Sequence, residues 1–214
     1  LSAVAQIDVA MNHRHYPAQA ALLVKKPSYL RLELIPVLGT PDFFLTANPE
    51  KLSIFIPSKK EFYIGKPTQA NLVKFLPWPL SVEDLVWILS GTYPPLRGKN
   101  IAYERYQENK LLRVEMKEPS GPSQIAWFDE KDRLRKFVRR NDLGEETYNI
   151  AYEHYETPEP IPGKISIHMA DGITSVTVRY SDLKVEKSTG DLSIFDLSIP
   201  ADVRAISLDL DGLQ

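Results

Sequence analysis

The chain has 214 residues, 43% of them hydrophobic and 25% charged, and this ordinary globular mixture excludes a disordered or collagen-like chain. There are 26 Lys and Arg residues against 28 Asp and Glu residues, so the net charge of −2 argues against a broad nucleic-acid-binding surface. The absence of Cys excludes disulfides, thiolate metal sites and Cys nucleophiles.

Short stretches in which apolar and polar residues alternate follow one another along most of the chain, with turn-forming sequences between them. Alternation of this kind is typical of half-buried β-strands. Such stretches are residues 3–11, 30–34, 52–56, 62–64, 101–103, 112–116, 165–169 and 176–180. Short connections favour antiparallel neighbours, so we predict a mainly β, α+β fold, a curved antiparallel sheet of about 11–13 strands.

Residues 42–64 depart from clean alternation. Phe43 and Phe44 are adjacent, and the stretches 54–56 and 62–64 carry apolar side chains on both faces of their predicted strands. A sheet with one wet face does not need this, so both faces must be covered here. Either an ordinary core fills the space or the sheet is an incomplete β-barrel around an apolar cavity, and spacing alone leaves both readings open.

The stretch from Pro67 to Leu89 changes to helical spacing. A first helix is expected to carry Leu72, Val73, Phe75 and Leu76, and a second to begin after Ser81, three residues before Asp84, in a relative of the capping box. The second helix has apolar residues on most of its circumference, which indicates that protein or ligand nearly surrounds it. We predict a helical plug or lid, at about residues 67–90, within one domain that covers residues 1–214.

Signatures of catalysis and of metal binding are missing. His13 and His15 share one face of a predicted strand but lack a third ligand nearby, and we expect neither a metal site nor a cofactor. The chain has no phosphate-binding loop, dinucleotide fingerprint, nucleophile elbow or zinc-protease motif. This favours a binding or transport protein over an enzyme. The basic run of residues 133–140 reads mostly as the wet face of one strand, with contact to acidic partners or lipid headgroups as the alternative.

Three segments resemble the bacterial outer-membrane lipoprotein receptor LolB and its periplasmic carrier relative LolA. They are residues 24–32 (VKKPSYLRL), 36–40 (PVLGT) and 76–91, which begin LPWPLS. The similarity is clearest over residues 20–96, and residues 195–200 resemble the last strand of the carrier.

The resemblance implies a half-closed β-barrel with helices in its mouth, in a periplasmic protein anchored to the outer membrane through a lipidated Cys that would precede Leu1. It implies that the protein binds acyl chains of lipoproteins or lipids and helps to deliver them at the outer membrane surface, with a LolA-like carrier as a candidate partner. Leu38 matches a receptor Leu that contacts the membrane. Lys26 matches a carrier Arg that holds the lid closed, and Lys lacks the forked donors of Arg.

Acyl chains in such a protein are expected to contact apolar side chains of the sheet and the helices. The candidates are Leu30, Leu32, Leu34, Phe43, Leu45, Ile54, Ile56, Phe62, Phe75, Leu85 and Ile88. The alternative function is a non-catalytic envelope sensor or scaffold that binds a protein partner, with its apolar groove filled by its own side chains or by a segment of the partner.

Overall fold

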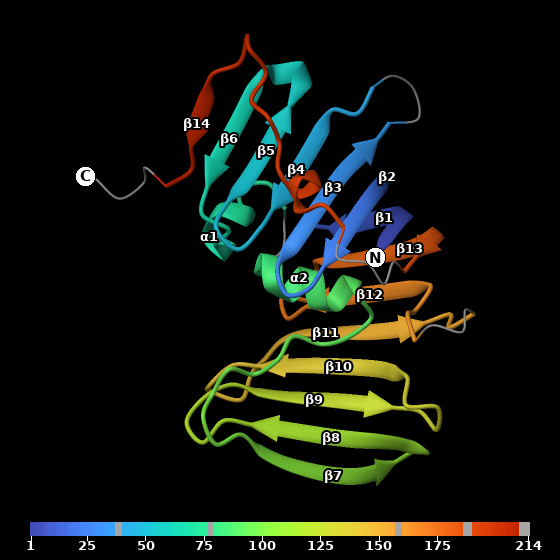
Figure 1. Ribbon diagram of the computed structural model, residues 1–214. Helices are drawn as coiled ribbons and strands as arrows, with labels where there is room; N and C mark the ends of the chain where they lie inside the picture. The colour runs from blue at the N-terminus through green and yellow to red at the C-terminus, as the bar shows by residue number, and fades with distance from the viewer. Residues whose placement is uncertain (37–39, 77–78, 157–159, 186–189, 210–214) are drawn as a thin grey trace. The chain divides into compact units, whose positions relative to one another are not determined.

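The computed structural model describes residues 1–36, 40–76, 79–156, 160–185 and 190–209, and strands dominate it (Figure 1). Two α-helices and two short 3₁₀-helices complete the regular structure of these ranges. The helices are η1 (Pro57–Lys59), α1 (Gln69–Leu72), α2 (Val82–Leu89) and η2 (Leu192–Phe195). The strands are β1 (Ser2–Met11), β2 (Arg14–Lys25), β3 (Tyr29–Ile35), β4 (Phe43–Ala47), β5 (Leu52–Ile56), β6 (Glu61–Gly65), β7 (Ala102–Glu108), β8 (Leu111–Lys117), β9 (Ser123–Phe128), β10 (Leu134–Arg140), β11 (Glu146–Glu153), β12 (Lys164–Met169), β13 (Ser175–Lys184) and β14 (Ala205–Ser207).

Hydrogen bonding places the strands of the described ranges in the order β14-β6-β5-β4-β3-β2-β1-β13-β12-β11-β10-β9-β8-β7. Sequence neighbours pair antiparallel, as β3 does with β4 and β11 with β12, whereas β14 runs parallel to β6. The prediction of a mainly β fold, built on an antiparallel sheet with few helices, is confirmed. Among the described residues the sheet has 14 strands, slightly more than expected, because a strand as short as β14 shows almost no alternation in the sequence.

Two compact units divide the chain. Unit 1 comprises Leu1–Ile7, Pro17–Ser90 and Tyr180–Gln214, and unit 2 comprises Asp8–Tyr16 and Gly91–Arg179. The long strands β1, β2 and β13 each contribute residues to both units.

One face of the unit 1 sheet, called the helix face below, is apolar from strand to strand. Leu22, Leu32, Leu45 and Ile54 lie opposite one another in β2 to β5, and none is more than 6% exposed. Residues directly opposite in neighbouring strands share a face, so these side chains form one continuous row. Helix α2 packs against β3, and its buried side chains complete this core.

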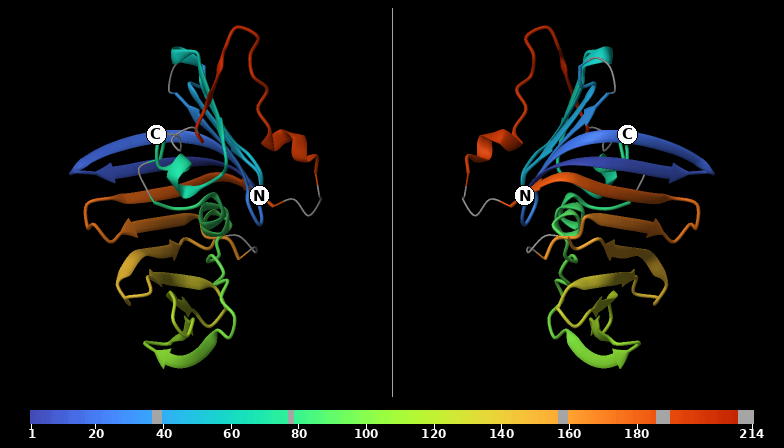
Figure 2. Two further views of the ribbon diagram at one scale, coloured as in Figure 1. Left: turned by 90° about the vertical axis from the view of Figure 1, so that its left-hand side faces the viewer. Right: turned by 90° about the vertical axis from the view of Figure 1, so that its right-hand side faces the viewer.

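The opposite face of the unit 1 sheet, called the strap face below, lies under the segment of residues 192–196, which contains η2. The Phe195 ring lies 5.4 Å from the Tyr29 ring, and Arg31 Nη1 donates a hydrogen bond of 2.7 Å to the Ile194 carbonyl. Figure 2 shows α1 and this segment on opposite sides of β4 to β6. The closing strand expected at residues 195–200 is not formed: the chain there leaves η2 and is irregular.

Helix α2 begins where the sequence predicts. The Ser81 hydroxyl accepts a hydrogen bond of 3.0 Å from the Asp84 amide, and Asp84 Oδ2 accepts one of 3.2 Å from the Ser81 amide. These reciprocal bonds satisfy two of the donors that every helix start leaves open. Helix α1 is shorter than expected: Thr68 caps it, but it ends at Leu72, before Val73 and Phe75.

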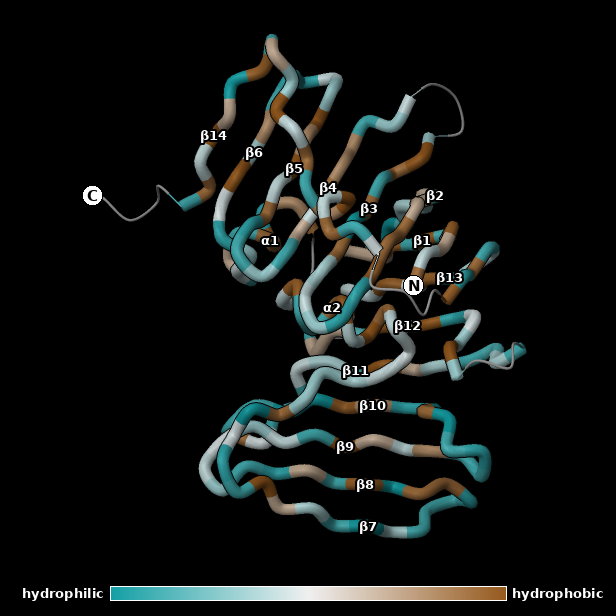
Figure 3. Tube along the Cα trace, viewed as in Figure 1, coloured by the Kyte–Doolittle hydropathy of each residue, from teal (hydrophilic) through white to brown (hydrophobic). Residues whose placement is uncertain are grey.

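Unit 2 has its own apolar core. Phe137, Ile150, Ile167 and Val176 lie opposite one another across β10 to β13, and all are at most 2% exposed. The Tyr93 ring stacks on Phe137 at 5.5 Å and covers part of this row. Along β8 hydrophobic and hydrophilic residues alternate (Figure 3), as expected for a strand that packs on one side.

Candidate functional site

The helix face of unit 1 brings most of the predicted lipid-contacting residues together. The cross-strand register places Leu30, Leu32 and Leu34 of β3 beside Phe43 and Leu45 of β4. Ile54 follows opposite Leu45. The buried members of the predicted set are Leu30, Leu32, Leu45, Ile54, Phe62, Leu85 and Ile88, and the partly exposed members are Leu34, Phe43, Ile56 and Phe75.

Phe62 lies on the other face from Ile54. In the β5–β6 pair Tyr63 is opposite Ile54, and Phe62 is opposite Phe55. The Phe62 ring is 5.9 Å from Phe55, which in turn lies 6.1 Å from Phe44 on the strap face. On the helix face Tyr63 takes the expected place, and the Phe75 ring meets it edge-on at 4.9 Å.

Helix α2 closes the helix face with apolar side chains. Its buried residues are Val82, Leu85, Val86, Ile88 and Leu89. Burying an aliphatic side chain stabilises a protein by about 1.5–3 kcal/mol, so these five contribute on the order of 10 kcal/mol. The site therefore offers hydrophobic contact, and the helix itself occupies the space over the sheet.

Two polar contacts join α2 to the rest of unit 1. The Lys26 ammonium lies 4.4 Å from the centre of the Trp87 ring, a cation–π contact. The Tyr180 hydroxyl donates a hydrogen bond of 2.7 Å to the Leu89 carbonyl at the end of the helix. Burial raises the pKa of the Tyr180 hydroxyl, so that it stays protonated and keeps donating, while burial lowers the pKa of Lys26.

The predicted lid-lock residue Lys26 thus contacts the helix that is expected to act as the lid. The sequence does not identify Trp87 as its partner, because the two residues are far apart in the chain and only the fold joins them. The predicted membrane-contact residue Leu38 lies outside the described residues.

The structure adds findings on metals and on the membrane. Within the described ranges, no three His, Asp or Glu side chains group so as to hold a metal ion. His15 Nδ1 instead lies 2.9 Å from Asp8, and His13 is not part of this contact. None of the described helices is of a length and apolarity that could cross a bilayer.

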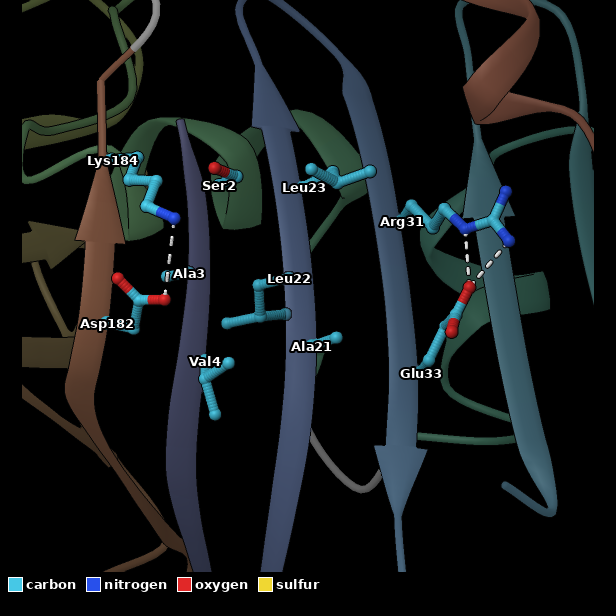
Figure 4. Close-up of a pocket in the computed structure, with 10 residues that line it drawn as sticks. All are labelled: Ser2, Ala3, Val4, Ala21, Leu22, Leu23, Arg31, Glu33, Asp182 and Lys184. Atoms are coloured by element: carbon cyan, nitrogen blue, oxygen red, sulfur yellow. Dashed lines mark hydrogen bonds and ion pairs between the residues drawn. The ribbon is translucent and has the colours of Figure 1, made fainter. Parts of the chain in front are cut away.

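A pocket of about 300 Å³ lies on the strap face, away from the predicted residues. Its lining residues are Ser2, Ala3, Val4, Ala21, Leu22, Leu23, Arg31, Glu33, Asp182 and Lys184, drawn in Figure 4. Sequence reasoning missed this site because three distant segments build it. A signal existed in the alternation itself, since Ala21 and Leu23 in β2, and Arg31 and Glu33 in β3, occupy the positions between buried residues of their strands.

The comparisons with known proteins bear on the fold. No protein-family model and no curated protein sequence matches the chain. Solved structures do match, and one of them is a LolA superfamily protein from Nitrosomonas europaea, with 14% identity, a TM-score of 0.62, and coverage of 92% of this chain and 89% of that one. The protein has the LolA-like fold.

Two further structures resemble this LolA-like chain over nearly its whole length. A domain described as an outer membrane lipoprotein-sorting protein, from Vibrio parahaemolyticus, is 12% identical with a TM-score of 0.61, and the match covers 91% of this chain and 88% of that one. A DUF1329 family protein from Desulfovibrio piger is 10% identical with a TM-score of 0.59, and covers 91% and 88%. At these identities the likeness establishes the fold alone.

Proposed function

We propose that the protein binds acyl chains of lipoproteins or lipids between α2 and the helix face of unit 1, and helps to deliver them at the outer membrane. One observation carries this proposal: the short helix α2 covers an apolar sheet face, and two polar contacts hold the helix in place. The lipoprotein-sorting description of the Vibrio structure supports a periplasmic or envelope setting.

The energetics suit an exchange between helix and ligand. Each acyl CH₂ removed from water contributes ~0.8 kcal/mol, so a sixteen-carbon chain contributes on the order of 12 kcal/mol. The buried side chains of α2 contribute a similar amount, on the order of 10 kcal/mol. A chain that displaces the helix therefore leaves a small net free energy, and such a ligand can be bound and later returned to a membrane.

The test is direct binding. Delipidated protein is titrated with a fluorescent fatty acid and with a diacylglyceryl lipopeptide. We expect saturable binding, and weaker binding by Leu34→Asp, which places a charge on the sheet face that receives the acyl chain. The matched control Ile35→Asp places the same charge on the opposite face of β3 and should leave the binding unchanged. Absence of saturable binding by the wild type contradicts the proposal.

The delivery step has its own test at Leu38. We propose that Leu38 contacts the membrane, so Leu38→Glu leaves the unfolding free energy nearly unchanged but slows lipid transfer to vesicles. Unchanged transfer by this variant removes Leu38 from the mechanism and leaves acyl binding intact.

The alternative function, a sensor or scaffold that binds a protein partner, has one observation in its favour. Leu45, Ile54 and Ile88 are all 0% exposed, so the protein's own side chains fill the site in this conformation. Lipid extraction of protein purified from envelopes separates the two functions: co-purified acyl chains support the carrier role, and a stoichiometric protein partner without lipid supports the scaffold role.

A further inference from the structure

The pocket on the strap face is independent of the helix face. Ala21 and Leu23 alternate along β2 with the buried residues Leu22 and Val24, so they project from the other side of the sheet. Four neighbouring strands, β13, β1, β2 and β3, contribute its lining. With strands about 4.8 Å apart, the pocket crosses about 14 Å of sheet.

The pocket has an apolar floor between two charged ends. Val4, Ala21 and Leu23 lie in the middle, with the Lys184–Asp182 pair at one end and the Arg31–Glu33 pair at the other (Figure 4). A small molecule with an apolar middle fits this floor, whereas an uncharged hydrocarbon makes no polar contact with either charged pair.

The two ends differ in which charge is available. Arg31 is engaged, because its Nε and Nη2 both contact Glu33 Oε1 and its Nη1 donates to the Ile194 carbonyl. Glu33 Oε2 has no hydrogen-bond partner in the part of the chain that the structure describes. This end therefore offers an acceptor, and its half-buried position strengthens a bond to a cationic donor.

At the other end the available charge is positive. Lys184 lies 3.8 Å from Asp182, and its side chain is 70% exposed, so this ion pair is loose. Ser2, on the neighbouring strand β1, also lines the pocket at this end and supplies a hydroxyl (Figure 4). An exposed pair of this kind contributes little, so an anionic group of a ligand can take the ammonium at small cost.

We propose that this pocket binds a short apolar peptide with free termini, whose carboxylate meets Lys184 and Ser2 and whose ammonium meets Glu33. An extended chain advances about 3.3 Å per residue, so a tetrapeptide spans the 14 Å between the two ends. Its apolar side chains lie on Val4, Ala21 and Leu23. Nothing in this site depends on acyl binding under α2.

The experiment is calorimetric titration of the protein with the tetrapeptide Ala-Leu-Leu-Ala. We expect saturable binding by the free tetrapeptide and at least about tenfold weaker binding by its acetylated, amidated form, because each lost terminus removes a charge-assisted hydrogen bond. Equal binding of both forms overturns the assignment of the charged ends. If dodecanoate binds and the tetrapeptide does not, and if Ala21→Trp abolishes the dodecanoate binding, the pocket binds a hydrocarbon and the peptide proposal is overturned.

Variants locate the site. Ala21→Trp fills the floor and should abolish tetrapeptide binding, whereas Gln19→Trp, on the same face of β2 but outside the pocket, should leave it unchanged. Lys184→Gln and Glu33→Gln should each weaken it by about tenfold. If Ala21→Trp fails to fold, amide chemical shifts of the wild type answer the question: changes confined to β1, β2, β3 and the end of β13 support the site, and changes elsewhere overturn it.

Discussion

The Lys26 ammonium lies 4.4 Å above the Trp87 ring, and this contact joins the end of β2 to the middle of α2. Burial lowers the pKa of Lys26, so the cost of desolvating the ammonium offsets part of its attraction to the Trp87 ring. What remains favours the closed position of the helix. In the proposed function this contact resists opening, and the apolar core supplies most of the stability of the closed state.

Removing the cation should loosen α2. Lys26→Met keeps the aliphatic stem but loses the charge, and a cation–π contact contributes about 0.5–1 kcal/mol at a partly exposed site. We expect amide hydrogens of residues 82–89 to exchange about two to five times faster. Lys25→Met, which alters the neighbouring residue, is the control. Equal exchange rates in Lys26→Met and wild type would show that the contact does not hold the helix.

The hydrogen bond from Tyr180 to Leu89 should stabilise unit 1 measurably. Tyr180→Phe leaves the Leu89 carbonyl without this donor, which should lower the free energy of unfolding by about 1–2 kcal/mol. Urea unfolding followed by circular dichroism measures the change. Tyr16→Phe is the control, since Tyr16 is 49% exposed and its loss should change the unfolding free energy by less than about 0.5 kcal/mol.

The capping box of α2 makes a separate prediction. Ser81→Ala removes the hydroxyl that accepts from the Asp84 amide, and loss of such a cap costs about 0.5–2 kcal/mol. The unfolding free energy should fall by that amount, and Ser81→Thr should restore most of it. A full loss in Ser81→Thr would mean that the effect comes from packing and not from the cap.

Unit 2 should lose stability at high pH through Tyr155. Burial raises the pKa of its hydroxyl to about 12, against an ordinary value near 10. The unfolded chain therefore releases this proton first, and stability falls as the pH rises from about 10 to about 12. Tyr155→Phe should flatten this part of the curve of unfolding free energy against pH. An unchanged slope would contradict the assignment.

Mutations on the two faces of the unit 1 sheet should have different effects on fatty-acid binding. Phe62→Leu perturbs the strap face, so it should lower stability by about 1 kcal/mol while leaving fatty-acid affinity unchanged. Leu45→Ala on the helix face should change that affinity as well. If Phe62→Leu alters affinity as strongly as Leu45→Ala does, acyl chains do not bind on the helix face alone.

The sequence predicts the strands and the second helix well because their signals are local. Alternation marks β3 and β8, and the Ser81–Asp84 spacing marks the start of α2. The first helix is overestimated, since apolar residues continue past Leu72 without being helical: Val73 is exposed, and Phe75 packs on Tyr63 from a turn. The spacing of apolar residues in one stretch of sequence does not distinguish residues inside a helix from residues in the turn that follows it.

The faces of the strands are harder to predict, and Phe62 shows why. Ile54, Ile56 and Phe62 are all even-numbered, which suggests one face. The turn between β5 and β6 contains η1 and Lys60 in the left-handed region at φ 53°, and it sets a register that pairs Ile54 with Tyr63. Register depends on the geometry of the turn, so parity in the sequence does not carry across it.

The most direct test of the account combines binding with exchange. Delipidated protein is titrated with a fluorescent fatty acid, and hydrogen exchange of residues 82–89 is measured with and without ligand. We predict saturable binding together with faster exchange in α2, because the acyl chain takes the place of the helix over Leu32, Leu45 and Ile54. Saturable binding that leaves the exchange of α2 unchanged, or no saturable binding at all, would contradict it.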